Sequence, residues 1–298
     1  MSQRYRFAPF TFFSYLIPVM GPMLLAAFTA GSAGAVPGTL VASVPLPVPG
    51  FGVSVATDCN GPSPDIFYTL ENDPTLYITN KTGANVGSRP IRDPAGAPVV
   101  IDEMAFDRIN NILYGVEHSS NPERVWTINP VTGGALFGFT SVTSSVGTFR
   151  DGLAYDASDN TLWISADIST TIEHYTVGGG FIGAITPLDA SGVALGDISG
   201  VQVGVGDQLY LGRNGLGQII RVKKSTGAFI GSFASPGGRD EGLECDPISF
   251  APTLVLWSRD FFAPGVIDAI ELEPGTCACG GATPTRPPTW GQIKVRYR

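Results

Sequence analysis

Short hydrophobic segments alternate with polar turns along most of this chain, and the same order of segments recurs about every 48 residues. The run DEMAFD at 102–107 is followed by similar runs at 151–156, 199–204 and 241–246, and a looser copy lies near 52–55. A fixed period of this length is typical of repeat architectures. The repeat therefore has to be interpreted before any single motif.

A complete copy contains four short segments rich in β-branched and aromatic residues, and the run just described is the first of them. The second segments each carry an aromatic residue and lie at 67–71, 113–117, 162–166, 209–213 and 255–259. A third segment follows, and then a turn, often Thr-Gly as at 132–133 and 226–227, leads into the fourth. Four such segments predict a four-stranded antiparallel sheet, which is the blade of a β-propeller.

The last copy lacks a fourth segment, because the chain reaches the turn sequence PGTC at 274–277 instead. Near the N-terminus, GTLVASV at 38–44 resembles the fourth segment GAFIGSF at 227–233. A strand there can pair with the last blade and close the ring, which removes exposed sheet edges. We therefore predict an all-β fold, a single β-propeller of five four-stranded blades, with six blades as the alternative.

Composition agrees with this fold and excludes several classes of protein. The 298 residues include 38 Gly and 24 Pro, and only 15% are charged, against roughly a quarter in an average soluble protein, which argues against helical bundles. A hydrophobic content of 43% is enough to bury a core and argues against disorder. The net charge of −8 argues against a nucleic-acid partner, since phosphate binding needs clustered Lys and Arg.

The N-terminus has the order of segments found in a secretory signal peptide. Arg4 and Arg6 are followed by an apolar stretch at 7–30 and by Ala-Gly-Ala at 33–35. We predict cleavage after Ala35 and a secreted, periplasmic or cell-surface location, with a retained membrane anchor as the alternative. No later segment is apolar over the roughly 18 residues that a membrane span requires.

The propeller is expected to occupy residues 36–279, and the composition changes after it. Residues 280–298 form a Pro-rich linker and a basic, aromatic tail. We consider two interpretations of the tail. It is either a sorting or docking tag used during export, or a frayed terminus or short strand packed on the propeller.

Four cysteines are present, Cys59, Cys245, Cys277 and Cys279, and in an oxidising compartment an even number suggests disulfides with three possible pairings. A zinc site is the alternative, but the one-residue gap between Cys277 and Cys279 is narrower than structural zinc sites use. Because these two residues follow the last repeat, we expect one bridge to tie the chain terminus to the folded body.

The GLAYD run at 152–156, the aromatic second segments and the Thr-Gly turns resemble a broad group of exported propellers similar to NHL-repeat, lactonase-like and TolB-like domains. The resemblance covers about residues 38–277. It implies the propeller architecture, and the lactonase-like members further imply a calcium site that polarises an ester carbonyl.

Polar residues recur at two positions of the repeat that should meet at one end of the central channel. Before the first segment of a blade we identify possible metal ligands: Glu103, Asp151, Asp197, Asp240 and Glu241. After the second segment we identify possible ligand-binding residues: Glu71, Asn72, Glu117, Asp167, Arg213, Asn214, Arg259 and Asp260. In an antiparallel pair the first strand starts beside the end of the second, so both sets reach the same face.

This acidic face has two interpretations. A ring of carboxylates and amides suits calcium, which takes six to eight oxygen ligands, and His118 would then be the general base. Alternatively, each Asp caps a turn and arginines such as Arg213, Arg239 and Arg259 neutralise the acids. His174 falls in a predicted third strand, where a packed or solvent-facing role is expected.

Three functions remain open. Because the sequence has no complete catalytic constellation, we expect an exported, non-enzymatic binding or scaffold propeller that recognises an extracellular protein, glycan or small ligand at the channel mouth. The first alternative is a calcium-dependent lactonase or esterase-type hydrolase with His118 as the base. The second is a surface adhesion module displayed through the C-terminal tail.

Overall fold

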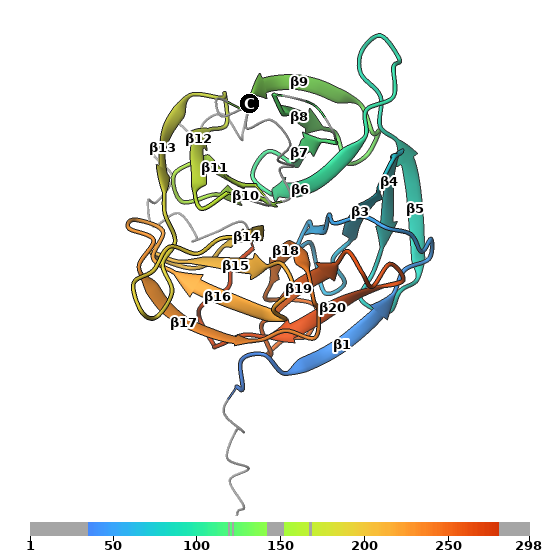
Figure 1. Cartoon of the computed structure of the whole chain (residues 1–298). Coiled ribbons are helices and arrows are strands. Elements are labelled where there is room, and N and C mark those ends of the chain that lie inside the picture. Colours follow the sequence, from blue (N-terminus) through green and yellow to red (C-terminus); the bar gives the residue numbers. More distant parts are fainter. Residues whose placement is uncertain (1–34, 119, 121, 142–151, 167–168, 280–298) are drawn as a thin grey trace, which may run out of the picture. The chain divides into compact units, whose positions relative to one another are not determined.

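The computed structural model describes residues 35–118, 120, 122–141, 152–166 and 169–279. The described residues form five antiparallel sheets of four strands each, arranged as the blades of a β-propeller. Figure 1 shows the blades around a common centre, with β6, β10, β14 and β18 innermost and β5, β13 and β17 at the outside. The predicted all-β fold with five blades is confirmed.

The strands follow the chain blade by blade. Blade 1 contains β2 (Ala56–Thr57), β3 (Ile66–Leu70), β4 (Asp73–Thr79) and β5 (Asn85–Pro90). Blade 2 contains β6 (Ile101–Asp107), β7 (Ile112–Glu117), β8 (Arg124–Ile128) and β9 (Ala135–Thr140). Blade 3 contains β10 (Gly152–Asp156), β11 (Thr161–Ser165), β12 (Ile172–Thr176) and β13 (Phe181–Ile185). Blade 4 contains β14 (Ile198–Val203), β15 (Leu209–Arg213), β16 (Gln218–Val222) and β17 (Phe229–Ala234).

Blade 5 is built from both ends of the described chain. Its strands are β18 (Asp240–Asp246), β19 (Val255–Asp260), β20 (Val266–Glu271) and β1 (Leu40–Pro45). Strand β1 pairs antiparallel with β20, so that Val44 lies opposite Ile267. The predicted closure of the ring by an N-terminal strand is therefore confirmed, and Figure 1 shows β1 along the outer side of β20.

The glycine that recurs in the first segment allows neighbouring innermost strands to approach each other. These strands contact one another in sequence around the whole centre. A Cβ atom on Gly200 would lie 2.5 Å from the carbonyl oxygen of Glu241 in the next blade, and one on Gly242 would lie 2.0 Å from that of Val53. Real Cβ atoms do not come that close to backbone atoms. Glycine is therefore required at Gly200 and Gly242 for the innermost strands of neighbouring blades to pack at this distance.

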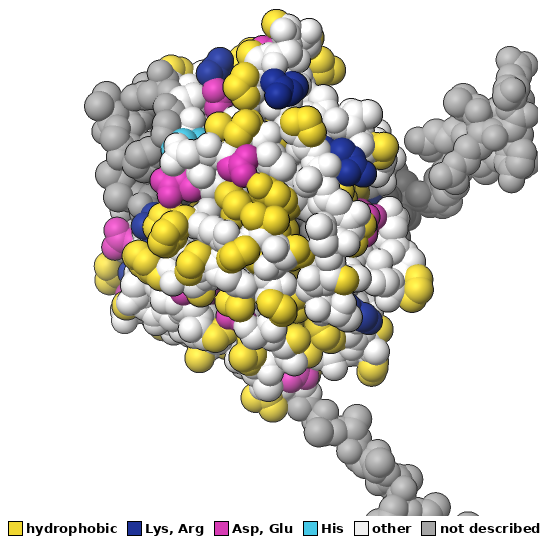
Figure 2. Space-filling model, turned by 90° about the vertical axis from the view of Figure 1, so that its right-hand side faces the viewer, with side chains coloured by type: hydrophobic (Ala, Val, Ile, Leu, Met, Phe, Trp, Pro, Cys, Tyr) yellow, Lys and Arg dark blue, Asp and Glu magenta, His cyan; other side chains and the backbone are white. Residues whose placement is uncertain are grey.

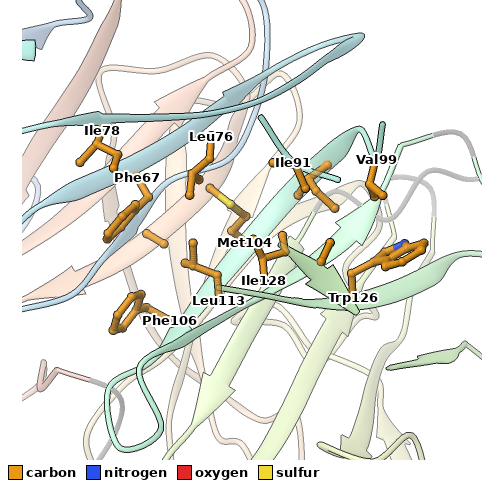
Figure 3. Packing of buried hydrophobic residues seen from close by; sticks show 13 residues of the cluster. Phe67, Leu76, Ile78, Ile91, Val99, Met104, Phe106, Leu113, Trp126 and Ile128 are labelled. Atoms are coloured by element: carbon orange, nitrogen blue, oxygen red, sulfur yellow. The ribbon is translucent and has the colours of Figure 1, made fainter. Parts of the chain in front are cut away.

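Hydrophobic side chains fill the space between neighbouring blades. Figure 3 shows the cluster between blades 1 and 2, where Phe67 and Phe106 stack with ring centroids 5.6 Å apart. Three tryptophans, Trp126, Trp163 and Trp257, are each buried in a cluster that contains residues of two blades. Dispersion contacts and removal of apolar surface from water therefore hold the blades together.

The outermost strands are more exposed than the inner ones. All seven residues of β18 are buried, whereas every residue of β5 is exposed or half-buried. Figure 2 shows the side of the molecule on which β5 and β1 lie, with hydrophobic side chains spread over it and few charged ones between them. Among the described residues, no helix is long and apolar enough to cross a membrane.

A disulfide joins the end of the described chain to blade 1. Cys59, just after β2, is bonded to Cys279, with Cα atoms 6.0 Å apart. The expected bridge from the chain terminus to the folded body is thus present, while Cys245 and Cys277 are buried free thiols. In the part of the chain that the structure describes, no group of three or more His, Cys, Asp or Glu is placed to hold a metal such as zinc.

Two predicted segments fall outside the described residues. They are the signal peptide at 1–35, except for Ala35 itself, and the linker and tail at 280–298. Both remain predictions.

The ring closure predicts a strong effect of a charge in β1. Val44 is 2% exposed and packs with Trp257 and Ile267, so Val44→Asp places an unpaired carboxylate in this core. We expect the free energy of unfolding to fall by about 3–5 kcal/mol. The matched variant Val36→Asp changes a side chain that is 63% exposed and should cost less than about 0.5 kcal/mol. Denaturant unfolding followed by circular dichroism measures both, and equal midpoints for the two variants would contradict closure through β1.

Candidate functional site

A cavity of about 180 Å³ opens on the face where the chain enters the innermost strands, and we call it the mouth pocket. It is lined by Gly52, Val53, Glu71, Asp102, His118, Arg239, Glu241 and Phe261. These residues come from blades 1, 2 and 5. The mouth pocket therefore lies where blade 5, which closes the ring, meets blades 1 and 2.

The strand pairing in blade 2 explains how two sequence-distant groups meet at this pocket. Asp102 lies at the start of β6 and His118 directly follows β7, its antiparallel neighbour. Ile101 pairs with Glu117, and the His118 backbone N–H donates to the Val100 carbonyl oxygen at 2.9 Å. The start of the first strand thus lies beside the end of the second, as the repeat predicted.

Asp102 and His118 form a hydrogen-bonded pair at the edge of the pocket. His118 Nδ1 lies 2.7 Å from Asp102 Oδ1 and 2.8 Å from Oδ2. The side chains are 18% and 13% exposed, so both reach solvent. A carboxylate on one ring nitrogen fixes the tautomer and the orientation of an imidazole. This arrangement is one that general acid–base chemistry uses.

Arg239 and Glu241 form an ion pair in the wall of the pocket. The Glu241 side chain is fully buried, and its Oε1 contacts Arg239 Nε. The Arg239 guanidinium also lies over the Phe261 ring, 5.2 Å from its centroid. A buried carboxylate is tolerated because this cation offsets its charge. The arginine was among those that the sequence suggested as neutralising the acids.

The charges of the pocket do not cancel. Three carboxylates line it, those of Glu71, Asp102 and Glu241, against the guanidinium of Arg239 and the imidazole of His118. Glu71 is exposed, and the turn that carries it is held by a hydrogen bond from its N–H to the Phe51 carbonyl oxygen, 2.7 Å long. The excess of negative charge favours positively charged ligands.

Arg259, expected to bind a ligand, is completely buried instead. Its guanidinium donates to carbonyl oxygens of blade 1, to Thr69 at 2.5 Å and to Ser54 at 3.2 Å. Burial is the main cause that lowers the pKa of Arg259 to about 10. These contacts join blade 5 to blade 1 and leave Arg259 outside the lining of the mouth pocket.

Three other candidates are held within turns and strand ends. Glu117 accepts a hydrogen bond from Trp126 Nε1 at 2.6 Å, and Asp260 accepts one from the Phe262 backbone N–H at 2.7 Å. Asn72 has a φ of 59°, a left-handed conformation that Asn tolerates in turns. The contacts of these residues are thus within turns and at strand ends, which is close to the structural role that the sequence analysis gave as the alternative to ligand binding.

The candidates on blade 4 are not among the residues that line the mouth pocket, although Asn214 forms a β-bridge with Arg239, which does line it. Arg213 Nε donates to the Gly196 carbonyl oxygen at 3.3 Å, and the Asn214 N–H donates to the Asp197 carbonyl oxygen at 2.9 Å. Asp197 is exposed, with a φ of 56°. Asp151 and Asp167, the candidates on blade 3, lie outside the described residues.

The remaining expected metal ligands are buried and already engaged. Asp240 accepts hydrogen bonds from the hydroxyls of Ser235 at 2.7 Å and Ser258 at 2.5 Å. Burial raises the pKa of Glu103 well above its ordinary value, which favours the neutral carboxyl. Calcium prefers ionised oxygen ligands that converge on one point. The described residues of the expected set do not fit that ion.

Sequence reasoning missed Phe261 and the backbone wall at Gly52 and Val53. The available signal was the Phe-Phe pair after β19, since two aromatic residues in a loop are unusual unless they contact something. Phe261 lies 5.4 Å from Phe51, ring centroid to centroid. Two loops from different blades thus build one apolar wall of the pocket.

His174 occupies β12, as expected, and stacks on Trp163 with ring centroids 4.0 Å apart. Its Nε2 lies 2.7 Å from Thr161 Oγ1, and burial lowers the pKa of this imidazole. It lines a second cavity, of about 270 Å³, which residues of blades 3 and 4 enclose. The stacked geometry agrees with a packing role.

Comparison with known proteins defines the fold but no family. No protein-family model and no curated protein matches the sequence. Among solved structures, the chain is similar to glutaminyl cyclase of Myxococcus xanthus, with a TM-score of 0.57 and 15% identity over 79% of this chain and 96% of that one. It also matches regucalcin, a calcium-binding protein of Agrobacterium tumefaciens, with a TM-score of 0.49 and 11% identity over 79% and 95%. A third match is to the WD40 repeats of RRP9, with a TM-score of 0.47 and 9% identity over 80% and 99%.

The strand topology establishes the five-bladed β-propeller, the Myxococcus xanthus structure is similar in fold, and no sequence family is shown. At 15% identity the likeness to the Myxococcus xanthus structure shows the fold alone. Function therefore has to be argued from the site.

Two buried glutamates on innermost strands predict a pH-dependent stability. Burial raises the pKa of Glu103 and of Glu244 above the ordinary 4.5, so the folded chain keeps protons that the unfolded chain releases. Their contribution is fully present below about pH 4.5 and is lost as the pH rises toward the raised values. Glu103→Gln mimics the neutral carboxyl, so we expect little change at pH 4 and a gain relative to wild type at pH 8.

The gain should be about 1.4 kcal/mol for each unit by which the pKa of Glu103 is raised. In a domain of this size each kcal/mol shifts Tm by about 2–4 °C. Calorimetry of wild type and variant at both pH values measures the difference. The exposed Glu71→Gln is the control and should show no pH-dependent gain. A Glu103→Gln effect that is the same at pH 4 and pH 8 would refute the raised pKa.

Proposed function

We propose that this protein is an exported binding propeller that takes a small, positively charged organic ligand into the mouth pocket. The observation that carries the proposal is the excess of carboxylates in a cavity with one aromatic wall, Glu71, Asp102 and Glu241 against Arg239. The N-terminal pattern and the Cys59–Cys279 disulfide support an oxidising compartment outside the cytoplasm.

The size and charge of the pocket limit the ligand. At about 180 Å³ the cavity is smaller than the roughly 300–1,000 Å³ typical of drug-sized ligands. An ammonium group beside Asp102 or Glu71 gains Coulomb energy, and an apolar body can pack on Phe261. An anion of the same size would be repelled by the same carboxylates.

A matched series of ligands tests the charge preference. Benzylamine, benzyl alcohol and benzoate are nearly equal in size and differ in charge, and isothermal titration of the purified protein measures each Kd. We expect benzylamine to bind most tightly and benzoate most weakly, because only the cation is attracted to the net negative pocket. Equal affinities for the three ligands would refute a cation site.

Two charge-matched variants locate the binding. Glu71→Gln removes a carboxylate of the pocket and should weaken benzylamine binding about three- to tenfold, which corresponds to roughly 0.7–1.4 kcal/mol. Glu271→Gln removes the same charge at the end of β20, outside the pocket lining, and should leave Kd unchanged. If both variants weaken binding equally, the ligand responds to net charge and the mouth pocket is not its site.

The Asp102–His118 pair favours a second candidate function, acid–base catalysis on an ester, lactone or similar carbonyl compound. His118 would take a proton from an attacking hydroxyl, while Asp102 stabilises the imidazolium that forms. The calcium-dependent version of this hydrolase lacks a fitting ligand set among the described residues. The candidate therefore rests on His118 and Asp102 alone.

A substrate panel with His118→Ala tests this candidate. The panel contains an aryl ester, a lactone and a peptide with N-terminal glutamine, since one similar structure is named a glutaminyl cyclase. Each substrate is assayed with added calcium and with a chelator. For a true substrate we expect His118→Ala to lower kcat by about 10²–10⁴-fold, the usual contribution of a general base. Turnover that survives this substitution would exclude the pair as the catalyst.

A further inference from the structure

The two free thiols lie close to each other, away from the mouth pocket. Glu241 and Cys245 lie near opposite ends of β18, with Glu241 at the mouth. Cys245 is 1% exposed and Cys277 is 5% exposed, and both belong to one hydrophobic cluster formed mainly by blades 4 and 5. Each thiol is therefore shielded from solvent and adjacent to the same neighbours.

The position of Cys277 is set by contacts on either side of it. The preceding Thr276 carbonyl oxygen accepts hydrogen bonds from the Val205 N–H at 3.0 Å and from Gln208 Nε2 at 3.2 Å. Cys277 Sγ lies 3.6 Å from the carbonyl oxygen of Val255, which pairs with the residue after Cys245. After burial, the adjacent Cys245 side chain is the next cause that raises the pKa of the Cys277 thiol, and both residues belong to the same buried cluster, so the two thiols are neighbours.

The established disulfide lies beside this pair. Cys59 Sγ is 3.9 Å from the carbonyl oxygen of Cys245, and Cys279 is two residues beyond Cys277. All four cysteines thus gather at one place, although β18 and β2 bring two of them from opposite ends of the chain. Four cysteines allow three pairings, and the Cys59–Cys279 bond leaves only one partner for each remaining thiol.

We propose that Cys245 and Cys277 are a site of oxidative modification and form a second disulfide. The segment after β20 would then be bonded to blade 1 through Cys279 and to the innermost strand of blade 5 through Cys277. These are the two blades that meet at the ring closure. The two disulfides would therefore crosslink blades 1 and 5 at the end of the propeller opposite the mouth pocket.

The chemistry requires an external disulfide as oxidant, such as oxidised glutathione or a thiol–disulfide oxidoreductase. The thiolate of one cysteine attacks the oxidant and releases one reduced thiol, and the second cysteine then displaces the other. Two electrons pass to the oxidant, and the two protons of Cys245 and Cys277 end on its two released thiols. Burial raises the pKa of the Cys277 thiol, which disfavours the reactive thiolate in the folded chain. The bond therefore forms before the C-terminal segment packs.

Counting thiols tests the proposal on the wild-type protein. The chain is folded in a glutathione redox buffer, then denatured without reductant in the presence of iodoacetamide, and its intact mass is measured. We expect no alkylated cysteine, because both disulfides have formed. Two alkylated cysteines per chain would overturn the proposal, and this measurement does not depend on whether any variant folds.

Variants with two cysteines each identify the pairing. Cys59→Ala/Cys279→Ala leaves Cys245 and Cys277, and we expect it to show no free thiol and one linked peptide pair after proteolysis. The matched variant Cys59→Ala/Cys277→Ala leaves Cys245 and Cys279, and we expect two alkylatable thiols. If this second variant is oxidised as completely as the first, pairing is unselective and the proposed site is wrong.

Discussion

The pairing of β1 with β20 is the interaction on which the rest of the structure depends. A four-stranded blade buries its faces only against neighbouring blades, so an open row of five would expose one face at each end. The N-terminal strand supplies the missing edge of blade 5, with Val44 packed in the core that blades 5 and 1 share. Arg259 strengthens the same junction by donating to blade 1 carbonyl oxygens. Closure therefore brings together the two blades most distant in sequence.

Closure also produces the mouth pocket. Because Gly200 and Gly242 allow the innermost strands to approach closely, the loops that enter these strands are brought to one small area. Asp102 is hydrogen-bonded to His118 there, and Glu241 forms an ion pair with Arg239. One carboxylate, that of Glu71, remains in addition, and the pocket keeps a negative charge. The proposed preference for a cationic ligand follows from this imbalance.

The opposite end of the same junction contains the cysteines. The disulfide from Cys59 to Cys279 joins blade 1 to the segment after blade 5, and Cys245 and Cys277 lie against it. Contacts between blades 5 and 1 are thus present at both ends of their junction: at the mouth pocket and at the cysteines on the opposite end. A propeller closed in this way can present a pocket made from three blades without depending on any single loop.

The repeat in the sequence predicts the all-β class, the five blades and the face on which polar residues gather, because periodicity and antiparallel pairing act between neighbours along the chain. The closing strand pairs the two ends of the described chain, and it was predictable because the last repeat lacks a fourth segment that the N-terminal segment resembles. It took the folded structure to show that His118 pairs with Asp102, that Arg259 is buried, and that Cys59 pairs with Cys279. The fold also brought Phe261 into the pocket and left Arg213 and Asn214 outside it. Equivalent positions of different repeats look alike in sequence. Which of them come into contact depends on how closely the strands of different blades pack, and the sequence pattern does not give that distance.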